Sequence, residues 1–326
     1  MRAGERLLRY ARIWTTSQDG TDRTPSTERQ RDLGHMLVKE MKELGLAEVE
    51  EDEYGYVYGT IPATPGMDRK PSIALIAHLD TAPDFSGEGV NPQVISDYDG
   101  GEIVLGDGTR RLSPEEFPDL EGLIGHTLIT TDGTTLLGAD DKAGIAEILT
   151  ACEELLAKKL PHGRIAVCFT PDEEIGHGAA LLSLDRLNAD YGYTVDGSDI
   201  DEINCETFHA AEAAVLVQGV NVHPGDAKHK MKNAALIAME FNAQLPSVER
   251  PEYTEGYEGF FHLTEMKGNV QSAELSYILR DHDAGHFQAR KETLTQSVKF
   301  LNEKYGAGTV ELSIRDQYRD MEEILR

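Results

Sequence analysis

The segment Ser72-Ile-Ala-Leu-Ile-Ala-His78-Leu79-Asp80 contains a continuous apolar run that ends in a histidine and a carboxylate. A run of this kind is typical of a strand that is buried on both faces of a parallel sheet. Side chains alternate along a strand, so His78 and Asp80 face the same way while Leu79 faces the core. The segment therefore predicts a buried strand with polar groups at its carboxyl end.

Strands and helices alternate on both sides of this segment. Arg164–Thr170 has the composition of a second buried strand, and Tyr193–Asp196 that of a short third strand. An amphipathic helix, Ala143–Lys158, lies between the first two, because its apolar residues recur at helical spacing. Such alternation favours an α/β fold, and we expect residues 1–206 to form a catalytic α/β domain with a mostly parallel sheet.

Two local signals add detail to this first domain. A helical stripe of leucines and methionines runs through Thr27–Leu44, and Gly45 is a suitable C-cap. The dipeptide Asp132-Gly133 separates two short β-rich runs, Thr127–Thr131 and Thr134–Leu137. Because Asp-Gly between two such runs is a strong hairpin signal, the sequence predicts a β-hairpin there.

The order of elements changes after residue 206. The sequence predicts strand, helix, strand, strand, helix and strand, in that order. Their expected bounds are 213–220, 230–244, 259–265, 272–281, 285–305 and 309–315. This βαββαβ order is that of a ferredoxin-like unit, so we expect residues 207–317 to fold as one small second domain.

The charge balance narrows the classes of partner. The chain has 326 residues, with 58 acidic and 31 basic side chains and a net charge of −27. Such a charge repels phosphate backbones and anionic lipid, so we expect neither a nucleic acid nor a membrane as partner. The three cysteines are scattered and form no CxxC pair, which favours a reducing compartment and a cytoplasmic protein.

Four polar motifs share one placement, at the end of a strand or the start of a helix. They are His78-Leu79-Asp80, Asp140-Asp141, Asp172-Glu173-Glu174 and Asp196-Gly197. In open α/β sheets the ligand crevice lies beyond the carboxyl ends of the strands, where three of these motifs would meet. Each motif alone has an ordinary structural explanation, such as a helix cap or a solvated turn. Together, however, so many carboxylates would repel one another unless cations lay between them.

A histidine with several carboxylates is a suitable ligand set for a divalent metal ion. Zinc is the first choice, with manganese or cobalt as alternatives. One carboxylate could bridge two ions, which would polarise a carbonyl and lower the pKa of a shared water. A glutamate left free of the ions could serve as general base. The reaction class that follows is metal-assisted hydrolysis, and an amide is the bond that we favour.

Four segments of the chain resemble those of a known family. They are IALIAHLDTAPD (73–84), LLGADDKAGIAEI (136–148), FTPDEEIGHGA (169–179) and YTVDG (193–197). In this order and at these separations they resemble the peptidase T family of tripeptide aminopeptidases, within the larger family of co-catalytic zinc aminoacylases and carboxypeptidases. The resemblance covers nearly the whole chain. It implies a zinc-peptidase-like catalytic domain with an inserted βαββαβ domain.

The same resemblance implies roles for the polar motifs. It implies two zinc ions held by His78, Asp140, Glu174 and Asp196. Asp140 would bridge the ions, with His78 and Asp196 on the first and Glu174 on the second. Glu173 would be the general base, and Asp80 would orient His78.

The resemblance also implies that the small domain acts as a lid and a dimerisation surface, so we expect a homodimer. It places His223 and Arg280 where the family offers a histidine and an arginine to the substrate. His223 would stabilise an oxyanion, and Arg280 would hold a substrate carboxylate. Residues 318–326 would begin a return to the catalytic domain.

The expected function is therefore that of a two-zinc aminopeptidase. It would hydrolyse the N-terminal residue of short peptides, with tripeptides as the expected substrates, through a metal-bound hydroxide and Glu173. A related dipeptidase, carboxypeptidase or N-acyl amino acid deacylase is the alternative within the same scaffold. A catalytically impaired metal-binding dimer is the alternative from another functional class.

One departure from the family pattern concerns the second ion. Family members carry a further histidine ligand in a C-terminal segment, and this sequence ends at Arg326. The later histidines, His262, His282 and His286, do not match that motif. The chain is therefore expected to be either C-terminally truncated or naturally short, with one firm and one weak metal site and with reduced or absent activity.

Overall fold

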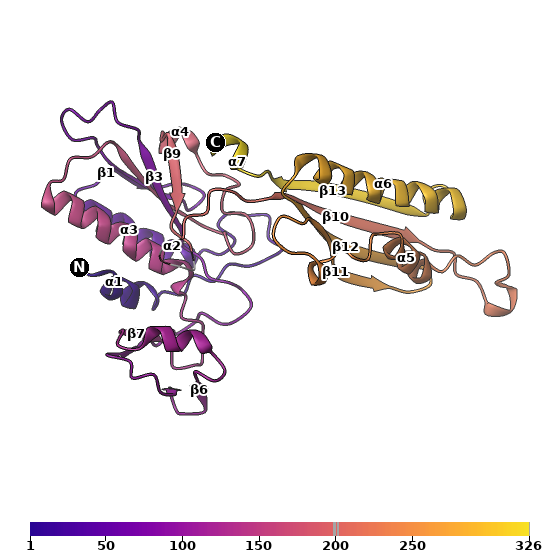
Figure 1. Ribbon diagram of the computed structural model, residues 1–326, viewed down its shortest axis with the longest axis horizontal. Coiled ribbons are helices and arrows are strands. Elements are labelled where there is room, and N and C mark those ends of the chain that lie inside the picture. The colour runs from indigo at the N-terminus through magenta and orange to yellow at the C-terminus, as the bar shows by residue number, and fades with distance from the viewer. Residues whose placement is uncertain (198–199, 201, 326) are drawn as a thin grey trace. The chain divides into compact units, whose positions relative to one another are not determined.

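The computed structural model of the protein describes residues 1–197, 200 and 202–325 (Figure 1). Contacts divide the chain into two compact units, Met1–Ile200 and Asp201–Arg326. The sequence-based boundary after residue 206 lies a few residues further along the chain. Arg326, the last residue of the expected 318–326 segment, lies outside the described residues.

The first unit is built on a five-stranded mixed sheet. Its strand order is β1 (Ala47–Glu51), β2 (Val57–Ile61), β8 (Ile165–Thr170), β3 (Ile73–His78) and β9 (Tyr191–Thr194). β3 pairs in parallel with both β8 and β9, whereas β2 pairs antiparallel with both β1 and β8. The predicted α/β class is confirmed, and the three strands that precede polar motifs are the parallel ones.

Helices cover one face of this sheet. They are α1 (Ala3–Tyr10), α2 (Gln30–Leu44) and α3 (Ala139–Lys158) (Figure 1). Along β8, Val167 and Phe169 pack into the core beneath these helices. Ala166 and Cys168 pack into a smaller core on the other face, together with Leu187 of the short helix α4 (Leu184–Leu187). β8 is an unbroken apolar run because both of its faces are buried.

The predicted end of α2 is confirmed by its backbone. Gly45 has a left-handed φ of +90°, and its N–H donates to the carbonyls of Met41 and Lys42. This is the C-cap geometry that favours glycine, because a side chain is strained at positive φ.

The hairpin predicted at Asp132-Gly133 is wrong. β7 (Leu128–Thr130) pairs antiparallel with β4 (Gln93–Ile95), and residues 134–137 form no strand. Oδ1 of Asp132 instead accepts hydrogen bonds from the backbone N–H (2.9 Å) and the hydroxyl (2.6 Å) of Thr134. This local side-chain turn satisfies groups that a hairpin ladder would pair. A further small two-stranded sheet joins β5 (Ile103–Leu105) and β6 (Arg110–Leu112).

The second unit is a four-stranded antiparallel sheet with two helices. The strand order is β11 (Phe260–Gly268), β12 (Ser272–Asp281), β10 (His209–Gln218) and β13 (Val310–Tyr318). α5 (Ala234–Ala243) and α6 (Ala284–Tyr305) share one apolar core with this sheet, and α7 (Glu322–Leu325) follows β13. The βαββαβ order is thus present as predicted. Among the described residues, no helix combines the length and the apolar character that crossing a membrane requires.

Candidate metal centre

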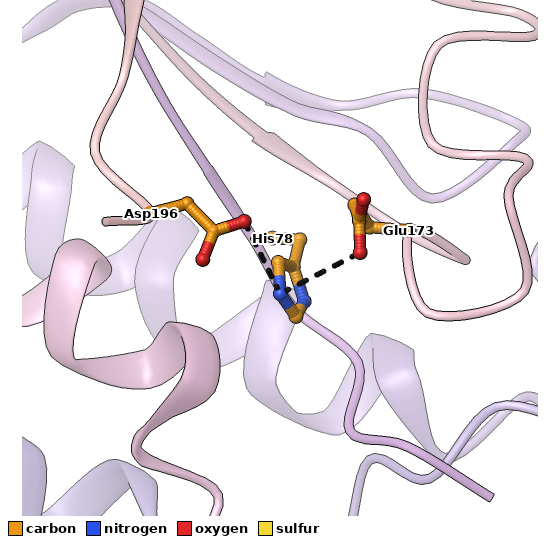
Figure 2. A group of neighbouring side chains, drawn as sticks. All are labelled: His78, Glu173 and Asp196. Atoms are coloured by element: carbon orange, nitrogen blue, oxygen red, sulfur yellow. Dashed lines mark ion pairs between the residues drawn. The ribbon is translucent and has the colours of Figure 1, made fainter. Parts of the chain in front are cut away.

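The carboxyl ends of the three parallel strands bring the predicted motifs together. His78 is the last residue of β3, Glu173 and Glu174 follow β8, and Asp196 follows β9. Asp140 reaches the same place from the start of α3. Figure 2 shows His78 between Glu173 and Asp196, each with a carboxylate oxygen directed at the imidazole. The convergence expected at the carboxyl edge of a parallel sheet is therefore present.

His78 is the centre of this cluster. Its Nε2 lies 2.8 Å from Oδ1 of Asp140, 3.8 Å from Oδ2 of Asp196 and 3.9 Å from Oε2 of Glu173. The His78 side chain is only 2% exposed, whereas those of Asp140 and Glu173 are 71% and 51% exposed. A buried imidazole with carboxylates on its open side is a suitable arrangement for a metal ion that must also meet a substrate.

Asp80 joins two of the motifs. Its buried carboxylate lies 3.4 Å from Nδ1 of His78, as expected for a residue that orients the ring. The same carboxylate accepts hydrogen bonds from the backbone N–H of Glu173 (3.0 Å) and of Glu174 (3.2 Å). Asp80 therefore also fixes the backbone that carries both glutamates, which the sequence alone does not indicate.

Burial and neighbouring charges shift the pKa values of these groups. Burial opposes protonation of His78, but the hydrogen bond and the negative charge of Asp80 outweigh it and raise the pKa of His78 to about 10. Burial raises the pKa of Glu173, Glu174 and Asp196, and neighbouring carboxylates raise it further while His78 opposes them. Carboxylates that burial and mutual repulsion disfavour in this way are groups that a divalent cation would stabilise.

Two overlapping groups of side chains fit a metal ion. One consists of His78, Glu173 and Asp196, and the other of His78, Asp140 and Glu174, with the ligand atoms of each group within 4.8 Å of one another. All four expected metal ligands and the expected base thus lie in one cluster. The way in which they divide between two ions, and the role of Glu173 as base, stay predictions.

The sequence pattern assigns no role to two buried residues behind the cluster, Asp141 and Lys142. Oδ2 of Asp141 accepts the backbone N–H of His78 at 3.1 Å, and burial raises the pKa of Asp141 to about 8. Nζ of Lys142 donates to the carbonyl of Ile13 at 2.7 Å, and burial lowers the pKa of Lys142 to about 7. Their place directly after Asp140 is the only signal in the sequence that could have indicated them.

The two predicted substrate residues belong to the second unit. His223 ends the loop after β10, and its Nδ1 accepts the backbone N–H of Gly225 at 3.1 Å. The guanidinium of Arg280, on β12, lies over the rings of Phe208 and Tyr318 at 5.4 and 5.6 Å. The contacts of the two side chains within the second unit are therefore defined, and their roles toward a substrate stay predictions.

Comparison with known sequences finds two matching families and a group of similar proteins. Residues 205–309 match the peptidase dimerisation domain family, and residues 126–244 match the M42 glutamyl aminopeptidase family. Peptidase T of Exiguobacterium sp. (strain AT1b) is 52% identical over 321 residues, which cover 98% of this chain and 78% of that protein. Peptidase T of Bacillus subtilis (strain 168) is 50% identical over 321 residues, with the same two coverages.

Comparison with solved structures concerns the fold. An aminopeptidase PepT from Bacillus cereus has a TM-score of 0.74 at 23% identity, over 98% of this chain and 76% of that chain. A tripeptidase from Staphylococcus aureus has a TM-score of 0.74 at 22% identity, with the same coverages. A dinuclear metal-binding peptidase of the M20 family from Bacillus subtilis has a TM-score of 0.61 at 12% identity, over 98% of this chain and 74% of that chain.

Proposed function

This chain belongs to the peptidase T family, and from this premise we infer that it is a metallo-aminopeptidase that acts on short peptides. The observation that carries the inference is the convergence of one buried histidine and four carboxylates at the carboxyl edge of the sheet. Groups so placed can bind metal ions and a reacting carbonyl in one crevice. We further propose tripeptides as the substrates, because the relatives with this fold include a tripeptidase.

We propose zinc as the metal. The ligands would be His78, Asp140, Glu174 and Asp196, with Asp140 shared between two ions. Zinc, when bound, supplies Lewis acidity for the scissile carbonyl and lowers the pKa of a water. The clustering of these ligand atoms around the imidazole of His78 and the raised pKa values of Glu174 and Asp196 support the assignment.

Glu173 is the general base in this proposal. Its carboxylate lies beside the ligand cluster but is half exposed, so it can reach a water and then the leaving amine. Burial raises the pKa of Glu173 toward neutral pH, where a base exchanges protons most effectively. The backbone N–H of Glu173 is held by Asp80, which limits where the carboxylate can go.

In this proposal, different residues bind the two ends of the peptide substrate. The acidic cluster would attract the free α-amino group of a peptide, Arg280 would hold a carboxylate, and His223 would support the oxyanion. We propose a homodimer because residues 205–309 match a peptidase dimerisation domain. A cytoplasmic location is also a proposal, supported by three free cysteines.

The experiment compares peptides that differ at one end. The zinc-loaded protein is expected to hydrolyse a tripeptide with a free N-terminus, and to leave the same tripeptide with an acetylated N-terminus intact. Release of amino acids is followed by mass spectrometry. Preferential cleavage of acetylated amino acids, of dipeptides or of the C-terminal residue would replace the proposal by one of the related amidase activities. A rate no higher than that of buffer would favour a metal-binding protein without activity.

A further inference from the structure

A buried network stands behind the backbone of Glu173. Asp172 is fully buried, and its carboxylate accepts three hydrogen bonds. Oδ2 accepts the backbone N–H of Ser26 at 2.7 Å, while Oδ1 accepts the hydroxyl of Ser26 at 2.5 Å and Nε2 of Gln30 at 2.7 Å. Oε1 of Gln30 in turn accepts the backbone N–H of Asp172 at 3.2 Å. Two residues at the entry to α2 thus bind both the side chain and the main chain of Asp172.

The backbone of Asp172 explains what this network holds. Its φ is +58°, in the left-handed region that residues with a Cβ rarely adopt. The turn continues with hydrogen bonds from Gly176 to the carbonyl of Glu173 (2.7 Å) and from His177 to that of Asp172 (2.9 Å). At this turn the chain leaves β8 and presents the next two N–H groups to Asp80. The left-handed conformation of Asp172 therefore determines where the backbone of Glu173 and Glu174 lies.

The hydrogen-bond chemistry of this network requires a carboxylate at position 172. Three donors meet the side chain and occupy both of its oxygens. Asparagine would keep one acceptor but would turn its own NH₂ group toward a donor, either that of Ser26 or that of Gln30. An apolar side chain would remove the buried acceptor of the Ser26 N–H and hydroxyl, and Nε2 of Gln30 would keep only its longer hydrogen bonds to the hydroxyls of Ser26 and Thr27, both 3.3 Å.

We propose that Asp172, held by Ser26 and Gln30, is a positioning residue that fixes the carboxylates of Glu173 and Glu174 at the metal centre. This proposal rests on the proposed function, because it takes those two glutamates as base and ligand. Partners in the outer shell of a metal centre change affinity or activity by about 10–100-fold when removed. A displacement of a catalytic group by about 1 Å can lower the reaction rate by about 100-fold.

The test uses Ser26→Ala, which removes one hydroxyl and leaves the backbone N–H in place, and Asp172→Asn, which turns an NH₂ group toward a donor of Ser26 or Gln30. Both are expected to lower kcat about tenfold or more while KM changes less than about twofold. Zinc affinity, titrated against a competing chelator, is expected to fall by about tenfold or more in both. Ser297→Ala is the matched control, since Ser297 is a buried serine on α6 in the second unit.

The outcomes separate a positioning role from a purely structural one. Unchanged kcat and unchanged zinc affinity in both variants, with only a lower Tm, would overturn the proposal. If the wild-type protein hydrolysed no peptide, the proposed function would fail, but the zinc titration would still decide. Weaker zinc binding in Ser26→Ala than in Ser297→Ala would then support the role of Asp172, and equal binding would reject it.

Discussion

At the scale of single residues, the protonation of His78 couples metal binding to pH. Burial lowers the pKa of His78, but the hydrogen bond and charge of Asp80, together with Asp141 and Asp140, outweigh it and raise this pKa to about 10, so a metal ion would have to displace a proton from the imidazole at neutral pH. Burial raises the pKa of Asp141, whose carboxylate accepts the backbone N–H of His78, to about 8. Metal binding at this cluster should therefore release protons and strengthen as pH rises.

Glu173 is the residue whose replacement best isolates the chemical step. Glu173→Gln keeps the size of the side chain but removes its capacity to take up a proton, so kcat is expected to fall by about 10²–10⁴. Zinc content after dialysis should stay that of the wild type, because His78, Asp140, Glu174 and Asp196 are intact. Steady-state kinetics with a tripeptide and metal analysis by mass spectrometry measure the two quantities.

The matched control for this prediction is Glu147→Gln. Glu147 is an exposed glutamate on α3, and its replacement makes the same change of charge. The control should retain the wild-type rate. A Glu173→Gln variant that also worked near the wild-type rate would remove Glu173 as the base, whereas loss of zinc from it would make Glu173 a metal ligand instead.

At the scale of secondary-structure elements, α1 is joined to α2 and α3 by one buried arginine. The Arg6 side chain is 1% exposed, and its guanidinium contacts Glu40 at 2.8 Å, Glu153 at 2.7 Å and the hydroxyl of Thr150 at 2.9 Å. Glu40 itself is buried and also accepts the hydroxyl of Tyr10 at 2.9 Å. The network fixes three helices that lie on the same face of the sheet as the larger core.

Arg6→Ala is expected to destabilise the first unit by about 3 kcal/mol, because Oε1 of the buried Glu40 loses its partner and only the partly exposed Arg9, 3.3 Å from Oε2, remains as a cation. Urea unfolding followed by the fluorescence of Trp14, the only tryptophan of the chain and part of the first unit, measures this free energy. Arg2→Ala is the control, since Arg2 is 89% exposed in its pair with Glu5 and should change stability by less than about 0.5 kcal/mol.

Secondary structure was predictable where apolar patterning is strong, and unpredictable where it is weak. β3 and β8 are buried on both faces, so their sequences are unbroken apolar runs. β1 has three glutamates among its five residues, and no apolar pattern indicates a strand there. β4 and β7 pair across a long stretch of chain, which no local signal at Asp132-Gly133 reveals.

The convergence of the candidate metal ligands was predictable to a similar extent, for a related reason. His78, Asp140, Glu174 and Asp196 stand at the ends of recognisable elements, so topology alone brings them together. Ser26 and Gln30 are far from Asp172 in the sequence, and only the fold brings them into hydrogen-bond contact with its carboxylate. Single polar residues such as these leave no periodic pattern in the sequence, so their hydrogen-bond partner can be identified only from the structure.

At the scale of the whole molecule, the excess of negative charge makes the stability of the folded state depend on bound metal ions. The chain carries 58 acidic and 31 basic side chains, so it repels itself at neutral pH, and the metal cluster concentrates that repulsion at one place. A divalent cation that binds only the folded state stabilises it by mass action, by about 2.7 kcal/mol at a hundred times its Kd. Metal removal should therefore be visible in global unfolding as well as in activity.

The last prediction concerns how the metal-free protein responds to pH. In Asp141 the pKa is raised from 3.8 to about 8, and in His78 from 6.5 to about 10, so in both cases the folded state binds a proton that the unfolded state has released. Stability of the metal-free protein is therefore expected to fall as pH rises, from about pH 4 to 8 through Asp141 and from about pH 6.5 to 10 through His78.

Zinc competes with these protons, so the difference in Tm between zinc-loaded and chelator-treated protein should be several degrees and should widen from pH 5.5 to 8.5. Thermal unfolding by circular dichroism at three pH values checks this, with zinc-loaded and chelator-treated Glu147→Gln as the control pair. A difference in Tm that stayed constant or narrowed over that range would mean that the proton on His78 and the metal ion do not compete for one place.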